Sequence, residues 1–183
     1  MSRVHTPASI ADAPEASRPH LEAIRKKVGV VPNLYRLIAN NPAVLEGHLS
    51  LAAALDGGRL PADTRERIAI AIAEFNGCDY CLSAHGFLGK NRAGLSDEEI
   101  AANRAGFSTN PKADAAVRFA VKVARERGHV GDADVDALRA AGYDDAEIIE
   151  ITVHVALNTW TNYMNVVGQT AIDFPILKAR QAA

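Results

Sequence analysis

The chain has 183 residues, of which 48% are apolar and 23% are charged, as in an ordinary globular protein. Its formal net charge is −2, and no apolar run approaches the roughly 20 residues of a membrane-spanning helix. We therefore expect neither a nucleic-acid nor a membrane partner. Residues 1–6 lack the apolar segment of a signal peptide, so we expect a cytoplasmic protein.

The first half of the chain is predicted to be helical after a loose lead over residues 1–13. Apolar residues at helical spacing predict helices at 15–28, 33–39, 42–56 and 64–75. The last of these is apolar nearly all round after Arg67, which indicates a buried, central helix. Asp63 and Glu66 have the spacing of a capping box at its start, and Asn76-Gly77 ends it.

The second half continues with a cysteine-bearing helix from Cys78 to about residue 90. Cap residues, prolines and glycines then predict further helices at 97–105, 111–127, 132–141 and 146–168. No stretch has the alternation of a strand. The sequence thus predicts an all-α fold in a single domain over residues 1–183, with its core at about 20–175.

Two of the predicted helical regions resemble each other. A shift of 81 residues places Asp63 on Asp144 and Glu66 on Glu147, and it aligns the isoleucines that follow. Cys78 and Cys81 then meet residues without thiols. We interpret this as an internal helical repeat in which the first copy alone carries cysteines; the alternative is a chance match between two buried helices with capped starts.

Cys78 and Cys81 are the only two cysteines, and His85 follows one helical turn after the second. On a helix these three side chains share one face. A thiol beside a base is the arrangement of an activated nucleophile, and the second thiol can resolve the product of the first. The helix N-terminus favours Cys78 as the ionised thiol, whereas the adjacent imidazole favours Cys81.

Glu66 lies in the helix before the cysteines, on the side of Ile70 and Ala73. A carboxyl group in apolar surroundings can exchange protons near neutral pH, so Glu66 is a candidate proton-transfer group. The alternative is that Glu66 merely caps its own helix.

Glu66, Cys78, Cys81 and His85 form the pattern Glu-x11-Cys-x-x-Cys-x-x-x-His. This pattern resembles the alkylhydroperoxidase D / carboxymuconolactone decarboxylase family in its peroxidase-related branch. The flanks support the resemblance, which covers about residues 20–175 and includes Val30-Val31-Pro32-Asn33-Leu34-Tyr35, Asn158, Asn162 and Asp173-Phe174-Pro175.

The resemblance implies an all-helical, alkylhydroperoxidase D-like bundle that assembles as a homotrimer or homohexamer. It implies thiol-dependent reduction of hydroperoxides without a bound cofactor or metal, with an external dithiol or lipoyl-type reductant. Carried over by residue, Cys81 attacks the peroxide, Cys78 resolves the product, and His85 and Glu66 transfer protons. The family has a histidine just before the second cysteine, where this chain has Tyr80, so Tyr80 is a candidate accessory residue.

Three other interpretations remain open. The cysteine pair could form a non-catalytic redox-sensing or thiol-disulfide exchange module. Cys78, Cys81 and His85 could bind zinc, although the chain has no second Cys/His pair of the kind structural zinc sites use. His154, in the apolar run of the last helix, is either a hydrogen-bonded core residue or a second accessory residue lining the same cavity.

Overall fold

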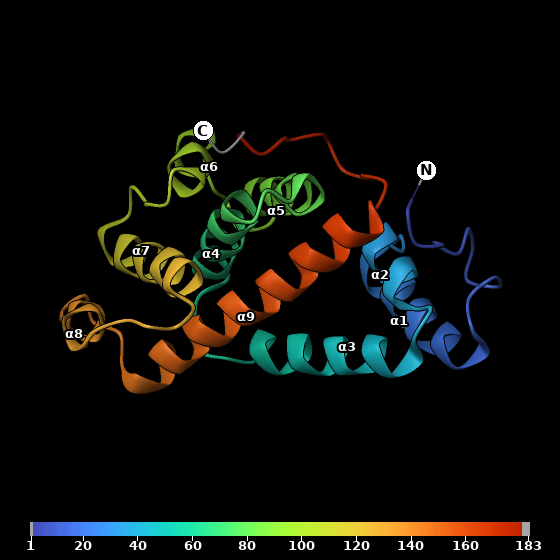
Figure 1. The fold of residues 1–183 in the computed structure, drawn as a ribbon, viewed down its shortest axis with the longest axis horizontal. Coiled ribbons are helices and arrows are strands. Elements are labelled where there is room, and N and C mark those ends of the chain that lie inside the picture. Colours follow the sequence, from blue (N-terminus) through green and yellow to red (C-terminus); the bar gives the residue numbers. More distant parts are fainter. Residues whose placement is uncertain (1, 181–183) are drawn as a thin grey trace.

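The computed structural model describes residues 2–180 and is all-α over that range, without strands (Figure 1). This confirms the predicted fold class, while the single-domain organisation stays a prediction. The helix predicted at 15–28 begins as a 3-10 turn, and the other boundaries lie within a few residues of those predicted. The helices are η1 (Glu15–Ser17), α1 (Arg18–Val28), α2 (Asn33–Ile38), α3 (Pro42–Asp56), α4 (Ala62–Phe75), α5 (Asp79–Asn91), α6 (Asp97–Arg104), α7 (Pro111–Glu126), α8 (Asp132–Ala140) and α9 (Asp145–Gly168).

Helix α4 is the central helix, as its apolar sequence predicts. It packs against α5, α6, α7 and α9, and Ile68, Ile70 and Ile72 are completely buried in it. Helix α9 crosses the molecule diagonally, with α3 on one side and α4 and α5 on the other (Figure 1). Because α4 contacts both α5 and α9, it fixes the space between these two helices.

The turn between α4 and α5 is formed by Asn76, Gly77 and Cys78. Gly77 has a φ of 67°, in the left-handed region that glycine adopts without steric cost. The Cys78 N–H then donates to the Ala73 carbonyl at 2.9 Å, and Cys78 becomes the N-cap of α5. This confirms the prediction that the cysteine-bearing helix, α5, begins at Cys78.

The capping box predicted for α4 is wrong. Helix α4 begins at Ala62 with Pro61 as its N-cap, so Asp63 and Glu66 are both already inside the helix. The carboxylate of Asp63 instead accepts the Thr64 N–H at 2.8 Å and binds Arg67 at 2.5 Å. The Glu66 side chain is therefore free to make a different contact.

The corresponding capping box of α9 is present. Asp144 accepts the Glu147 N–H at 2.9 Å, and Glu147 accepts the Asp144 N–H at 2.9 Å. Helix α9 then continues unbroken through Asn158, the residue that the 81-residue shift aligns with Gly77. The internal repeat stays a prediction.

Both ends of the chain lie along the helices. The Arg3 N–H donates to the Gly168 carbonyl at 2.7 Å, at the end of α9. After α9 the chain runs back over α5 towards α6 as an extended segment, residues 170–180 (Figure 1). The side chains of Ser83 and Asp79 hold its backbone by accepting the N–H groups of Leu177 and Ala179 at 2.9 and 2.8 Å.

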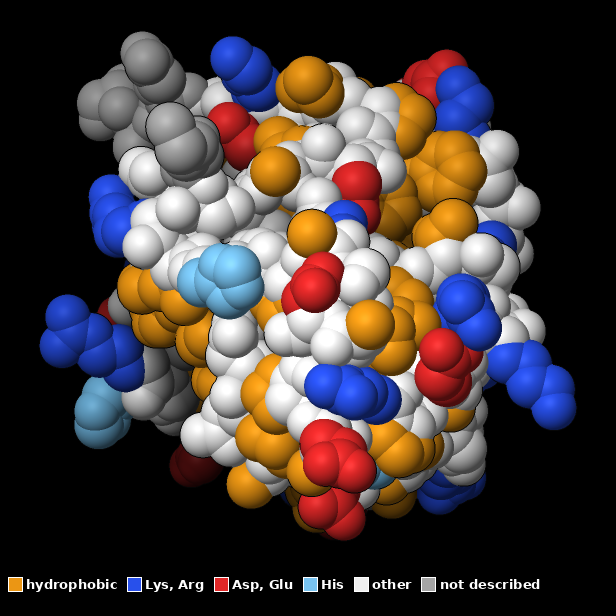
Figure 2. Space-filling view, turned by 90° about the vertical axis from the view of Figure 1, so that its right-hand side faces the viewer, with side chains coloured by type: hydrophobic (Ala, Val, Ile, Leu, Met, Phe, Trp, Pro, Cys, Tyr) orange, Lys and Arg blue, Asp and Glu red, His pale blue; other side chains and the backbone are white. Residues whose placement is uncertain are grey.

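The surface carries charges of both signs. On the face drawn in Figure 2, basic and acidic side chains alternate with apolar ones, and neither sign dominates. None of the helices between residues 2 and 180 has the length and apolar character needed to cross a bilayer.

A buried ion pair connects α4 to α6. Glu99 accepts from the Arg67 guanidinium at 2.7 Å, from the Asn103 amide at 2.9 Å and from the Thr109 N–H at 2.9 Å. Burial opposes the charge, but hydrogen bonds from Ser108, Thr109 and Asn103 outweigh it and lower the pKa of Glu99 to about 2. The ionised carboxylate therefore stabilises the folded protein.

We expect this contribution to disappear in acid. The folded pKa of Glu99 lies below its ordinary value of 4.5, so its stabilisation is complete above that pH and is lost as the pH falls through about 2. Urea unfolding measured across this interval should show a weaker pH dependence for Glu99→Gln than for the wild-type protein. Equal pH dependence in both proteins would contradict the assignment.

Candidate functional site

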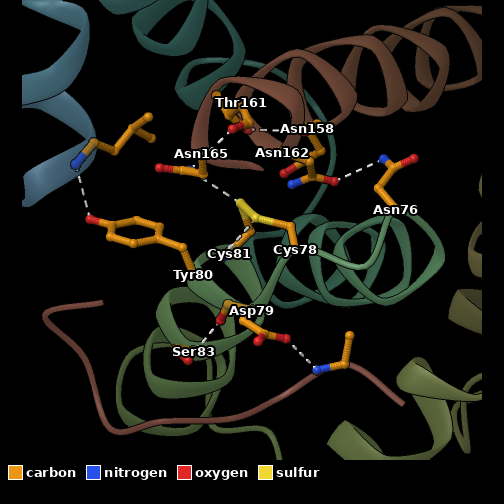
Figure 3. Close-up of a disulfide and its surroundings, with 12 residues drawn as sticks. Asn76, Cys78, Asp79, Tyr80, Cys81, Ser83, Asn158, Thr161, Asn162 and Asn165 are labelled. Atoms are coloured by element: carbon orange, nitrogen blue, oxygen red, sulfur yellow. Dashed lines mark hydrogen bonds between the residues drawn. A yellow bond between two sulfur atoms is a disulfide. The ribbon is translucent and has the colours of Figure 1, made fainter. Parts of the chain in front are cut away.

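Cys78 and Cys81 are joined in a disulfide at the start of α5, with their Cα atoms 5.3 Å apart (Figure 3). Each sulfur accepts a hydrogen bond from a different source. The Cys81 backbone N–H donates to the Cys78 sulfur at 3.2 Å, which is the N-cap bond of α5. The side-chain amide of Asn165, on α9, donates to the Cys81 sulfur at 3.3 Å. A backbone N–H at the start of α5 and the Asn165 amide are thus placed to stabilise a negative charge on the Cys78 and Cys81 sulfurs, respectively.

His85, one helical turn after Cys81 on α5, forms a pair with Glu66. The His85 Nδ1 lies 2.9 Å from the Glu66 Oε2, and this bond connects α5 to α4. Because an ionised carboxylate can only accept, Nδ1–H donates and Nε2 is left to take up or release a proton. Both side chains are about one quarter exposed, so the pair can exchange protons with solvent.

The structure excludes the capping alternative for Glu66, and its proton-transfer role stays a prediction. Its carboxylate binds His85 rather than the start of its own helix. The sequence brought together Glu66, Cys78, Cys81 and His85, and in the fold these four residues lie on the facing sides of α4 and α5. Their catalytic roles remain predictions.

Tyr80 points away from the disulfide (Figure 3). Its hydroxyl oxygen accepts the Leu34 N–H of α2 at 3.1 Å, and its ring packs edge-on against Phe174 at 5.8 Å. Burial, together with the nearby carboxylate of Asp173, raises the pKa of Tyr80 far above its ordinary value. These contacts favour a structural role in which Tyr80 anchors α2 and the C-terminal segment to α5.

His154 lies in another part of α9. Its Nε2 is 3.7 Å from the Glu150 Oε1, and burial lowers the pKa of this imidazole. By the helical rise it is about 16 Å along α9 from Asn165, the residue of this helix that contacts Cys81. The geometry thus favours the core alternative for His154 over a place beside the thiols.

Both cysteines are buried, with exposed fractions of 1% for Cys78 and 3% for Cys81. A cavity of about 480 Å³ lies on the outer side of α5, between Phe87, Arg104 and Leu177, and neither cysteine lines it. Within residues 2–180, no three His, Cys, Asp or Glu side chains come together as a metal site. Reaction at the sulfurs therefore requires a small reactant or a local opening of the structure.

Asn165 is the residue of this site that the sequence analysis missed. The available signal was a row of uncharged polar residues at helical spacing on the otherwise apolar α9, namely Asn158, Thr161, Asn162 and Asn165, all of which are buried. Such a row on a buried helical face indicates a polar contact across the helix packing.

Comparison with known proteins supports the same family as the motif. A model of the carboxymuconolactone decarboxylase family matches residues 42–126, which include the Glu66, Cys78, Cys81 and His85 positions. The structure of a peroxidase-related protein from Ralstonia eutropha JMP134, described as an alkylhydroperoxidase AhpD core, is similar with a TM-score of 0.83 at 27% identity, covering 94% of this chain and 92% of that chain. The chain thus matches the carboxymuconolactone decarboxylase family over residues 42–126 and is similar in fold to an alkylhydroperoxidase AhpD core.

Two further proteins are similar to this chain. A peroxidase-related protein from Silicibacter sp. TM1040 has a TM-score of 0.80 at 25% identity, covering 93% of this chain and 94% of that chain. An uncharacterized protein from Haemophilus influenzae is 37% identical over 67 residues. That match covers 36% of this chain and spans about half, 54%, of the curated relative. Asn165 lies outside the region that the family model matches.

The anchoring role of Tyr80 predicts a stability effect. Tyr80→Phe leaves the partly buried Leu34 N–H without its acceptor, so we expect the free energy of unfolding to fall by about 1 kcal/mol. Tyr163→Phe is the matched control, because Tyr163 is 58% exposed and its change should stay within about 0.5 kcal/mol. Urea unfolding of both variants checks this, and an unchanged Tyr80→Phe would argue against the anchor.

Proposed function

We propose that this protein is a thiol-dependent peroxidase that reduces hydroperoxides through Cys81 and Cys78. The observation that carries the proposal is a Cys-x-x-Cys disulfide at a helix N-terminus with the His85–Glu66 pair one helical turn further on. In the reduced protein, Cys81 and Cys78 supply an attacking and a resolving thiol. The His85 imidazole and the Glu66 carboxylate supply a path for protons.

The proposed reaction begins with the ionised Cys81 sulfur attacking the terminal oxygen of a hydroperoxide, ROOH. The O–O bond breaks, Cys81 becomes a sulfenic acid, and the leaving RO⁻ takes a proton from His85 to give the alcohol. The Cys78 thiol then gives its proton to His85, and its sulfur attacks the Cys81 sulfur to form the disulfide. The S–O bond breaks, and the leaving hydroxide takes that proton from His85 and departs as water. An external dithiol exchanges with this disulfide, is oxidised to its own disulfide, and returns both cysteines to thiols.

The His85–Glu66 pair suits the proton transfer in this cycle. Glu66 accepts the Nδ1–H of His85, which fixes the tautomer and leaves Nε2 for the reacting groups. Its partial exposure lets the pair recover a proton from solvent after each turnover. The assignment of Cys81 as the attacking thiol follows the family and its position one turn before His85.

Partners are proposed on the same basis. The buried sulfurs favour a small hydroperoxide head, and reduction then requires an external dithiol or lipoyl-type reductant that reaches the pair through a local opening. Exposed apolar residues along α9, Ile149, Val166 and Val167, support self-association of the chain as a homotrimer or homohexamer.

A redox-sensing module is the second candidate, because the burial of both sulfurs would also suit a pair that is oxidised once and slowly reduced. Turnover separates the two functions. With hydrogen peroxide or cumene hydroperoxide and dihydrolipoamide as reductant, we expect steady peroxide consumption that Cys81→Ser reduces to the uncatalysed rate. Oxidation of the two thiols to one disulfide per chain, without further peroxide consumption, would favour the sensor.

Glu66→Gln tests the proton path. Glutamine can still accept the His85 N–H but carries no charge, so we expect kcat to fall roughly 10²-fold with little change in fold. Glu147→Gln is the matched control, because the 81-residue shift aligns Glu147 with Glu66 but Glu147 caps α9. This change should leave kcat unchanged. Equal rates in both variants and the wild-type protein would remove Glu66 from the mechanism.

A further inference from the structure

Helix α9 presents uncharged polar side chains to the disulfide (Figure 3). Asn162 and Asn165 lie beside the two sulfurs (Figure 3), with exposed fractions of 0% and 3%. Neither carries a charge, and neither belongs to the Glu-Cys-Cys-His pattern. Burying two amide side chains next to the Cys78–Cys81 pair is costly unless their polar groups are hydrogen-bonded.

The orientation of the Asn165 amide is fixed by its contacts. Its Nδ2 donates to the Thr161 carbonyl at 3.1 Å and to the Cys81 sulfur at 3.3 Å. A backbone carbonyl can only accept, so the NH2 group must face it and the amide cannot be flipped. Asn165 therefore directs an N–H at Cys81, and its Oδ1 is buried without a partner among residues 2–180.

Asn162 provides a complementary atom. Its Oδ1 accepts from the Asn76 amide at 2.9 Å, and its Nδ2 is buried without a partner in the part of the chain that the structure describes. The site thus contains one free acceptor and one free donor, three residues apart on α9. Buried polar groups are normally hydrogen-bonded, so these two atoms indicate a small polar ligand that both donates and accepts.

We propose that Asn165 is a catalytic residue that binds the ionised Cys81 sulfur, and that Asn162 and Asn165 together bind the O–O–H head of the hydroperoxide. This inference rests on the proposed function and names its peroxide-binding groups. The peroxide O–H donates to the Asn165 Oδ1, and a peroxide oxygen accepts from the Asn162 Nδ2. Both bonds hold the terminal oxygen near the sulfur that attacks it.

The charged side chains near the disulfide all have other partners, so a neutral donor binds the Cys81 sulfur. On α5 and α4 the ionisable groups beside the pair are His85 and Glu66, which bind each other, and Asp79, which accepts the Ala179 N–H. Asp173 lies near Tyr80, on the side of α2. No charged side chain on α9 is hydrogen-bonded to either sulfur within the described residues, so the Asn165 N–H is the contact α9 makes with Cys81.

The thiolate of Cys81 can be titrated directly. In a Cys78→Ser background, where Cys81 is the one remaining thiol, thiolate absorbance against pH should show that Asn165→Ala raises the Cys81 pKa by about one pH unit or more, because a hydrogen bond to a charged group is lost. Asn165→Ser serves as a second variant should alanine impair folding. Asn158→Ala is the control, because the Asn158 amide donates to the His154 carbonyl and not to a sulfur.

The peroxide-binding part is tested by single-turnover oxidation with hydrogen peroxide. We expect Asn162→Ala to slow sulfenic acid formation about tenfold while the Cys81 pKa stays at the wild-type value, and Asn165→Ala to change both. If Asn165→Ala and Asn162→Ala match Asn158→Ala in both measurements while the wild-type protein turns over, this inference fails and the peroxidase proposal stands. If the wild-type protein consumes no peroxide, the proposed function fails, and the titration still decides whether Asn165 stabilises the sulfur.

Discussion

The start of helix α5 is the constraint on which the site depends. Gly77 turns the chain out of α4 in a conformation that other residues rarely adopt, and Cys78 then takes the N-cap position. There its sulfur accepts a backbone N–H that would otherwise lack a partner. The same turn folds α5 against α4, so that Glu66 and His85 face each other. One short turn thus sets both the hydrogen bonding of the Cys78 sulfur and the position of the His85–Glu66 pair.

The two sulfurs accept hydrogen bonds from different parts of the fold. Cys78 uses the end of its own helix, which is a local feature, while Cys81 uses Asn165 from a helix more than eighty residues away. The first contact forms whenever α5 forms, whereas the second exists only when α9 is packed in place.

Local signals in the sequence were sufficient for most of the fold. Asn41, Ser96, Asn110 and Asp144 cap their helices as expected from short-range rules, because a cap bonds only to residues two or three positions away. Asp63 misled the prediction because Pro61 starts α4 two residues earlier. Tyr80 precedes Cys81 directly in the sequence but does not share its site. Successive helical residues point about 100° apart, so Tyr80 faces α2 instead. The Asn165 contact is tertiary: the spacing of polar residues on α9 indicates a buried polar face, but it does not name Cys81 as the partner.

The contrast between the broken α4–α5 pair and the continuous α9 explains why their contributions to the site differ. A helix that starts at the site has free N–H groups to offer, and α5 gives one to Cys78. Helix α9 passes the site in its interior, where each backbone N–H is already bonded to the preceding turn. It can therefore reach a sulfur only through side chains, and a buried position next to a thiolate excludes a carboxylate there because two like charges would be desolvated together. A short amide satisfies both conditions, and Asn165 is the residue that meets them.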